Sequence, residues 1–115
     1  MDEHKQVYAT PSAALSHKRQ ELAPEIEKAF QSFSRSVFAA GALDTKTKQL
    51  IAVAAAHVTQ CPYCIRGHTK AALRAGADER ELMEAIWVAA EMRAGAAFAH
   101  SVIALDAMNN EERKP

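Results

Sequence analysis

The chain has 115 residues, with 14 basic and 14 acidic side chains and no net charge at pH 7. This balance gives no support to nucleic acid or an acidic membrane surface as a partner. Hydrophobic residues make up 49% of the chain and charged residues 24%, which is ordinary for a folded protein. We therefore expect one domain over residues 1–115, with a core so modest that a partner chain contributes to it.

The sequence contains no segment typical of export or of a membrane protein. Its first 20 residues lack an apolar stretch behind a basic start, so they do not resemble a secretory signal. The longest apolar run, LIAVAAAHV, is too short to cross a bilayer. We expect a cytoplasmic location, where two cysteines more often bind metal, act in redox chemistry or are simply buried than form a structural disulfide.

Alanine at 25 positions and glycine at only four predict an all-α fold, a compact array of four to six helices. After a polar arm that ends near Ser12, Pro24 is placed to begin a helix that runs to Phe38 and is closed by Gly41. The apolar side of this helix is expected to carry Ile26, Phe30, Phe33 and Phe38.

The middle of the chain predicts two helices joined at a proline. Asp44 is a suitable N-cap for the helix TKTKQLIAVAAAHVTQ, residues 45–60. Pro62 disfavours helical geometry at the preceding Cys61 but suits the first position of a new helix, PYCIRGHTKAALRA, which Gly76 ends. Cys61 is therefore expected near an N-cap and Cys64 in the first turn.

The last helical segment begins at a capping-box pattern formed by Asp78 and Glu81 and continues to Met108. Gly95 lies within it, and we expect the helix to bend or break there. The remaining residues, 109–115, are polar and are expected to form a frayed tail.

Both cysteines and two of the five histidines fall within HVTQCPYCIRGH, residues 57–68. A thiolate is the reactive form of cysteine and a helix N-terminus stabilises it, so C-x-x-C at a helix start suits redox work. Cys64 and His68 are four residues apart on one helix face, where the imidazole can accept or return the thiol proton. This favours Cys64 as the nucleophile, with Cys61 able to attack oxidised Cys64 and form a disulfide.

Other interpretations of the same residues stay open. A zinc ion could be bound by Cys61, Cys64, His68 and, one turn earlier, His57, but the sequence has no second C-x-x-C to complete a typical site. His57 is either a titrating group beside the thiols or a packing residue hydrogen-bonded within its own helix. The thiols could also be inert, or exchange disulfides with other proteins.

The segment KQLIAVAAAHVTQCPYCIRGHTKAALRAGADERELMEAIWVAA resembles the AhpD-like branch of the carboxymuconolactone decarboxylase superfamily. The resemblance covers about residues 43–104, between an N-terminal helical extension and a short polar tail, and rests on the C-x-x-C-x-x-x-H set and its AALRAGADERELMEAI continuation. It implies an all-helical fold assembled as a homo-trimer or homo-hexamer.

The resemblance also implies an activity and a role for each residue of the set. By resemblance to the alkylhydroperoxidases of this branch, Cys64 would be the thiol that attacks the peroxide, Cys61 the resolving thiol and His68 the proton relay. A dithiol such as dihydrolipoamide, working through an adaptor protein, would reduce the disulfide. The decarboxylases of the superfamily generally lack the cysteine pair, so the resemblance does not favour decarboxylation.

One position departs from the family pattern. The family usually has a glutamate twelve residues before the first cysteine, which completes the relay, whereas this chain has Gln49. Glutamine can orient an imidazole or a water but cannot take a proton near neutral pH. Either the relay differs or the activity is weak, and we consider His57 and Glu91 as hypothetical replacements for the carboxylate.

These observations predict a thiol-dependent peroxidase that reduces hydroperoxides without a metal or cofactor. Its expected catalytic residues are Cys64, Cys61, His68, Gln49 and His57. The alternatives are a redox-responsive or zinc-stabilised assembly protein without catalytic activity, which Gln49 favours, and a C-x-x-C thiol–disulfide oxidoreductase.

Overall fold

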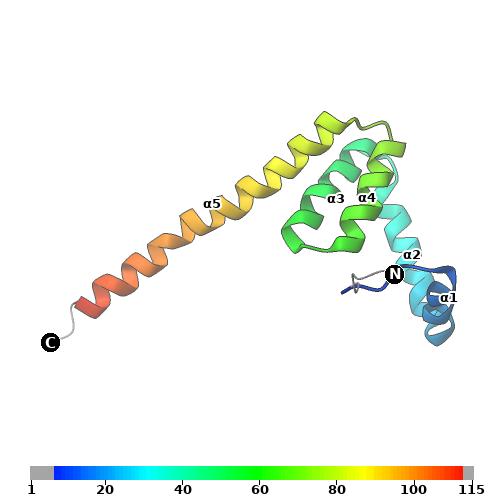
Figure 1. Cartoon of the computed structure of the whole chain (residues 1–115), viewed down its shortest axis with the longest axis horizontal. Helices are drawn as coiled ribbons and strands as arrows, with labels where there is room; N and C mark the ends of the chain where they lie inside the picture. Colours follow the sequence, from blue (N-terminus) through cyan, green and yellow to red (C-terminus); the bar gives the residue numbers. More distant parts are fainter. Residues whose placement is uncertain (1–6, 113–115) are drawn as a thin grey trace, which may run out of the picture. The chain divides into compact units, whose positions relative to one another are not determined.

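The computed structural model describes residues 7–112, which form five α-helices and contain no strand (Figure 1). The all-α prediction is therefore confirmed. Contacts divide the chain into two units, residues 1–39 and 40–115. The expectation of one domain stays a prediction.

The first unit contains α1 (Ala13–Leu22) and α2 (Pro24–Phe38). The helix α1 was not predicted as a separate element, although its N-cap, Ser12, accepts a hydrogen bond from the backbone N–H of Leu15 at 3.2 Å. Pro24 occupies the first turn of α2, as predicted. No side chain of α1 or α2 is buried. The apolar stripe of α2 at Ile26, Phe30 and Phe33 is mostly exposed.

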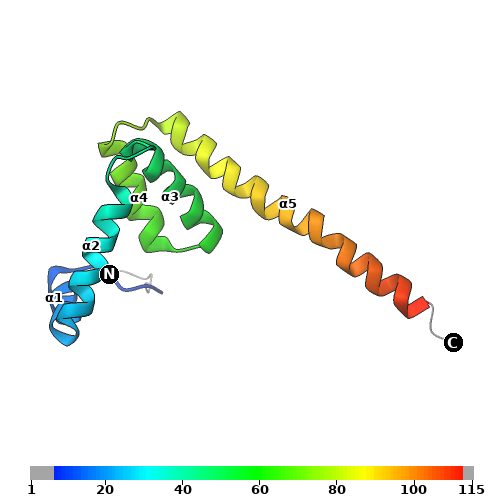
Figure 2. The same ribbon diagram turned by 180° about the vertical axis from the view of Figure 1, so that it is seen from behind.

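The second unit contains α3 (Thr45–Thr59), α4 (Pro62–Arg74) and α5 (Glu79–Glu112). The helix α3 packs against both α4 and the first part of α5 (Figures 1 and 2). The core of this unit is built from Val53, Ala72, Ala77 and Leu82, with Leu50 and Ile86 packed against it. Because two of the four core residues are alanines, the core buries little apolar surface.

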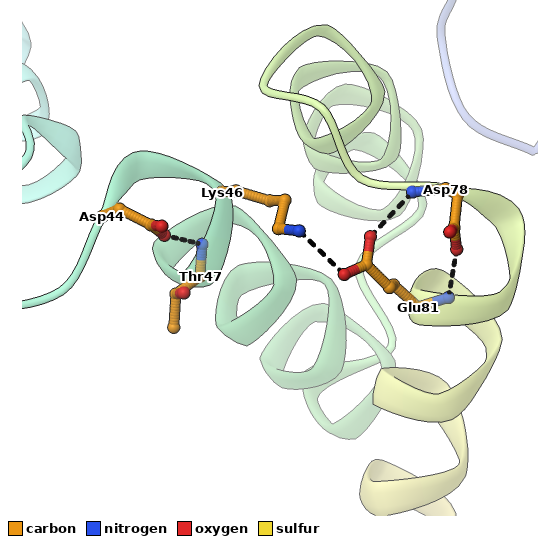
Figure 3. Close-up of polar contacts among 5 residues, drawn as sticks. All are labelled: Asp44, Lys46, Thr47, Asp78 and Glu81. Atoms are coloured by element: carbon orange, nitrogen blue, oxygen red, sulfur yellow. Dashed lines mark hydrogen bonds and ion pairs between the residues drawn. The ribbon is translucent and has the colours of Figure 1, made fainter.

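The predicted N-terminal caps at Asp44 and at Asp78–Glu81 are confirmed (Figure 3), whereas α2 ends at Phe38 with Ala39 as its C-cap, two residues before the predicted Gly41. A carboxylate oxygen of Asp44 accepts from the N–H of Thr47 at 2.8 Å. Asp78 and Glu81 form the reciprocal capping box, with each backbone N–H donating to the other side chain at 3.0 Å and 2.8 Å. Lys46 Nζ lies 2.8 Å from the second oxygen of Glu81, which ties the start of α3 to the start of α5. The helix α4 ends before Gly76, whose φ of 101° favours glycine.

The expectation of a break near Gly95 was wrong, because α5 continues as one helix of 34 residues to Glu112. Four residues of the expected polar tail, 109–112, are therefore helical, and residues 113–115 lie outside the described part. The first part of α5 packs on α3, and its second part extends past α3 and α4 (Figures 1 and 2).

Because α5 is unbroken, it is long enough to be compared with a membrane-spanning helix. Within residues 7–112 it is the one helix long and apolar enough to cross a bilayer, with a mean hydropathy of 1.2 over its most apolar window. Only 6% of that window is buried. Length and composition alone do not separate a spanning helix from one that packs in a protein interface, so this is weak evidence for a membrane.

The contact between Lys46 and Glu81 predicts a pH dependence of stability. The hydrogen bond from Lys46, followed by that from the Asp78 N–H, lowers the pKa of Glu81 below its ordinary value. The resulting stabilisation is present above the unfolded pKa and is lost as pH falls through the folded pKa. Glu81→Gln keeps an acceptor for the Asp78 N–H but loses the charge, so we expect a lower free energy of unfolding at pH 7 and a deficit that shrinks in acid.

Urea denaturation of both proteins between pH 7 and pH 3 measures this deficit. Glu84→Gln, which changes another exposed glutamate of α5, is the matched control and should show no such trend. A deficit of constant size across the whole pH range would contradict the ion-pair interpretation.

Candidate active site

A sharp reversal between α3 and α4 positions both cysteines. Gln60 follows the last residue of α3 in the left-handed conformation, with φ of 58° and ψ of 48°. Pro62 then begins α4, which leaves Cys61 as the N-cap and Cys64 as the third helical residue. The Cys61 N–H donates back to the Ala56 carbonyl at 3.2 Å. The predicted positions of the two cysteines are therefore confirmed.

The two thiols are free and adjacent. Their sulfur atoms lie 2.9 Å apart and share a hydrogen bond, while the backbone N–H of Cys64 donates to Cys61 Sγ at 3.3 Å. Cys61 is half-buried and Cys64 is exposed. A disulfide requires a sulfur separation of about 2.05 Å, so only a small movement separates the dithiol from a disulfide.

The hydrogen bonds distribute charge unequally over this pair. The Cys64 side chain, the Cys64 N–H and the Tyr63 N–H, in that order, lower the pKa of Cys61. The hydrogen bond to Cys61, the partial desolvation of the Cys64 sulfur and the neighbouring negative charge raise the pKa of Cys64. These hydrogen bonds therefore favour a negative charge on Cys61 over one on Cys64.

His68 is held from the neighbouring helix by Gln49. The Oε1 atom of Gln49 lies 2.7 Å from Nδ1 of His68, which joins α3 to α4 across 19 residues of sequence. Gln49 is 8% exposed and is the buried polar side chain of the described core. His68 is half-buried and follows Cys64 by one helical turn. The position that the sequence singled out for departing from the family pattern is thus in direct contact with the expected base.

The remaining expected site residues have other surroundings. His57 donates from Nδ1 to the Val53 carbonyl at 2.8 Å, within its own helix. Glu91 is exposed on α5. Within residues 7–112 no three His, Cys, Asp or Glu side chains gather to hold a metal ion, so the zinc alternative gains no geometric support.

Arg93 contacts this region, although sequence reasoning missed it. Its Nη1 atom donates to the Val58 carbonyl at 2.6 Å, so α5 binds the end of α3 three residues before Cys61. A cation at a helix C-terminus is a recognisable signal when it lies in the same helix. Arg93 comes from 35 residues further along the chain, and only the packing of α5 on α3 brings it there.

The chain is similar in sequence to one protein family and to individual proteins from bacteria. The sequence pattern of the carboxymuconolactone decarboxylase family matches residues 24–107. An uncharacterized protein from the cox locus of Paracoccus denitrificans is 63% identical over 94 residues, which cover 82% of this chain and 84% of the relative.

Two solved structures share the fold. A carboxymuconolactone decarboxylase family protein from Legionella pneumophila is 34% identical with a TM-score of 0.67, over 84% of this chain and 87% of that one. A family protein from Thermotoga maritima, whose description suggests involvement in an antioxidative response, is 28% identical with a TM-score of 0.53, over 70% of this chain and 92% of that one.

The charge distribution of the cysteine pair can be tested by alkylation. In Cys64→Ser the hydroxyl can still donate to Cys61 Sγ, whereas in Cys64→Ala only the backbone N–H remains. We expect iodoacetamide to modify Cys61 at lower pH in Cys64→Ser than in Cys64→Ala, because the thiolate is the reactive form. The measurement is the rate of alkylation against pH. Identical pH profiles would show that the side chain of residue 64 does not stabilise the Cys61 thiolate.

Proposed function

The chain belongs to the carboxymuconolactone decarboxylase family, and from this membership we propose that it is a thiol-dependent peroxidase that reduces hydroperoxides. The observation that carries the proposal is the free Cys61–Cys64 pair, with 2.9 Å between its sulfur atoms, at the start of the helix that bears His68. The Thermotoga relative, for which involvement in an antioxidative response is suggested, supports the same class of chemistry.

In the proposed reaction His68 first takes one proton from the dithiol, which leaves one negative charge shared by the two sulfur atoms. The form with its charge on Cys64 attacks the peroxide, since Cys64 is the more exposed thiol. A sulfur–oxygen bond forms as the oxygen–oxygen bond breaks, giving a sulfenic acid on Cys64 and an alkoxide that takes the proton back from His68. The Cys61 thiol then attacks the sulfenic sulfur, forming the disulfide and releasing water.

The hydrogen bond between the sulfurs has a defined part in this scheme. Because the lowered pKa of Cys61 draws the charge toward that sulfur, Cys64 becomes nucleophilic only when its proton moves across to Cys61. The same proton is then in place on Cys61 when this thiol resolves the sulfenic acid. An external dithiol, of which dihydrolipoamide is an example, reduces the disulfide in two exchange steps, directly or through an adaptor protein.

A homo-oligomer is the second part of the proposal. The chain buries few large apolar side chains, yet α5 exposes many of them: Met83, Trp87, Val88, Met92, Phe98, Val102, Ile103, Leu105 and Met108. A helix of 34 residues is roughly 50 Å long, and so long an apolar surface is unfavourable in water. Copies of the chain that pack through α5, as a trimer or hexamer, would cover this surface.

A thiol–disulfide oxidoreductase is the alternative that one observation favours. Cys61 combines the N-cap position with a lowered pKa, which is the arrangement of an attacking thiol in disulfide exchange. In that case the substrate would be a disulfide, and peroxide would leave the thiols of the reduced protein unchanged.

The peroxidase proposal is tested by counting free thiols on reduced protein before and after one equivalent of cumene hydroperoxide, and again after dihydrolipoamide. We expect two thiols to disappear and both to return. Cys64→Ser should reduce turnover to the uncatalysed rate. Cys61→Ser should form one sulfenic acid, which dimedone traps, without further turnover.

These two serine variants control for each other, because each keeps one thiol and the same backbone. Sulfenic acid on Cys61 in Cys64→Ser, and none on Cys64 in Cys61→Ser, would reverse the assigned roles. Two thiols that stay free after prolonged exposure to peroxide would exclude the peroxidase and favour disulfide exchange.

The oligomer is tested by light scattering after size exclusion. We expect the unmodified chain to have three or six times the monomer mass. Phe98 is 82% exposed in the single chain, and Phe98→Glu should raise the dissociation constant at least about tenfold, because an unpaired charge would be buried. Asn109→Glu adds the same charge at a polar position of α5 and is the control. A monomeric unmodified chain would contradict the proposal.

A further inference from the structure

The hydrogen bond between Gln49 and His68 has a defined donor and a defined acceptor, and the reaction proposed above does not depend on which is which. The Gln49 atom that faces the ring is Oε1, which has no hydrogen and can only accept. The Nδ1 atom of His68, 2.7 Å away, must therefore carry the proton of the contact. In a neutral imidazole one ring nitrogen carries the proton and the other carries a lone pair, so the lone pair is then on Nε2.

The surroundings of Gln49 fix the contact. Gln49 is 8% exposed on α3, and Val53, one turn further along the same helix, is completely buried against α4 and α5. A buried amide that changed its orientation would have to break a hydrogen bond without water to replace it. The side chain of Gln49 is thus held on rigid, packed helices rather than on a loop.

We propose that Gln49 is a positioning residue that holds His68 in the tautomer protonated at Nδ1, so that Nε2 is the atom that takes and returns the proton of the cysteine pair. This inference rests on the proposed peroxidase. In that reaction the proton moves from the dithiol to Nε2 and from Nε2 to the departing alkoxide. The Nδ1–H bond to Gln49 is kept throughout, so no proton passes to the amide.

A neutral amide and a carboxylate at position 49 would act differently on the same ring. Both accept the Nδ1–H, so both select the same tautomer. Only a carboxylate adds a negative charge that stabilises the imidazolium. The relay in this chain therefore ends at His68, and neither His57 nor Glu91 is needed to complete it.

The tautomer can be read directly by nitrogen chemical shifts of ¹⁵N-histidine-labelled, reduced full-length protein at about pH 8.5, two units above the ordinary pKa of histidine. We expect a protonated Nδ1 and an unprotonated Nε2 at His68, whose signals are assigned by their loss in His68→Asn. His57, whose Nδ1 donates to a carbonyl, is an internal reference for the same tautomer, and the exposed His17 is a reference for averaging. A His68 protonated at Nε2 would overturn the inference.

Two substitutions separate positioning from packing. Gln49→Met has nearly the same shape but no acceptor, so His68 should average between tautomers, and kcat/KM for peroxide should fall about tenfold, a part of the 10²–10⁴-fold contribution of a general base. Gln49→Glu still offers an acceptor to the Nδ1–H and should keep the tautomer. If Gln49 had a purely packing role, the tautomer of His68 would be the same in Gln49→Met, in Gln49→Glu and in the unmodified protein.

The outcomes for the tautomer and for the function are distinguishable. Peroxide turnover with His68 protonated at Nε2 would refute the role of Gln49 and leave the peroxidase intact. A fixed Nδ1–H tautomer in a protein whose thiols ignore peroxide would support the positioning by Gln49 and refute the peroxidase. A tautomer that is unchanged in Gln49→Met would show that something other than Gln49 holds the ring.

Discussion

The close packing of α3 against α4 is the constraint on which the candidate site depends. Val53 on α3 and Ala72 on α4 are both completely buried in the same core cluster. Gln49 precedes Val53 by four residues, and His68 precedes Ala72 by four residues. Since residues four apart share a helix face, the faces that bury Val53 and Ala72 also bring Gln49 to His68. The small alanine side chain allows this approach, and a larger residue would separate the amide from the imidazole.

The reversal that follows α3 places Cys61 where its sulfur accepts a backbone N–H, and this favours a negative charge on Cys61. An N-cap side chain commonly accepts the N–H of the third helical residue, and here the cap is Cys61 and the donor is Cys64. The negative charge is thus favoured at the start of α4, beside the C-terminal end of α3, whose carbonyls also carry partial negative charge. Arg93 binds one of these carbonyls, at Val58, and so places a positive charge where the two helix ends meet.

Local signals in the sequence were sufficient for most of the fold. Asp44, Pro62, Gly76 and the Asp78–Glu81 box each act within a few residues, and the structure has them in their predicted places. The expected break at Gly95 was wrong for an energetic reason. One glycine costs a helix only about 1 kcal/mol, and its alanine-rich neighbours favour the helix strongly enough to offset that cost.

The site was only partly predictable from the sequence, because its essential contacts join distant residues. The pairing of Cys61 with Cys64 follows from their spacing, and the N-cap position of Cys61 already implied that this sulfur would receive an N–H. The contacts of Gln49 with His68 and of Arg93 with Val58 depend on how three helices pack, and no local pattern encodes them. His57 illustrates the converse, since its one-turn distance from Cys61 suggested a shared site while its Nδ1 is bonded within its own helix.

The length of α5 connects the site to the proposed assembly. Up to Ala89 the helix has buried side chains, and from Phe98 to Glu111 every side chain is exposed in the single chain. Arg93 lies between these two parts, so the same helix that would be held by neighbouring subunits also bonds the end of α3 just before Cys61. The bond from Arg93 to the Val58 carbonyl thus connects the helix that carries the exposed apolar surface with the reversal that positions the two cysteines.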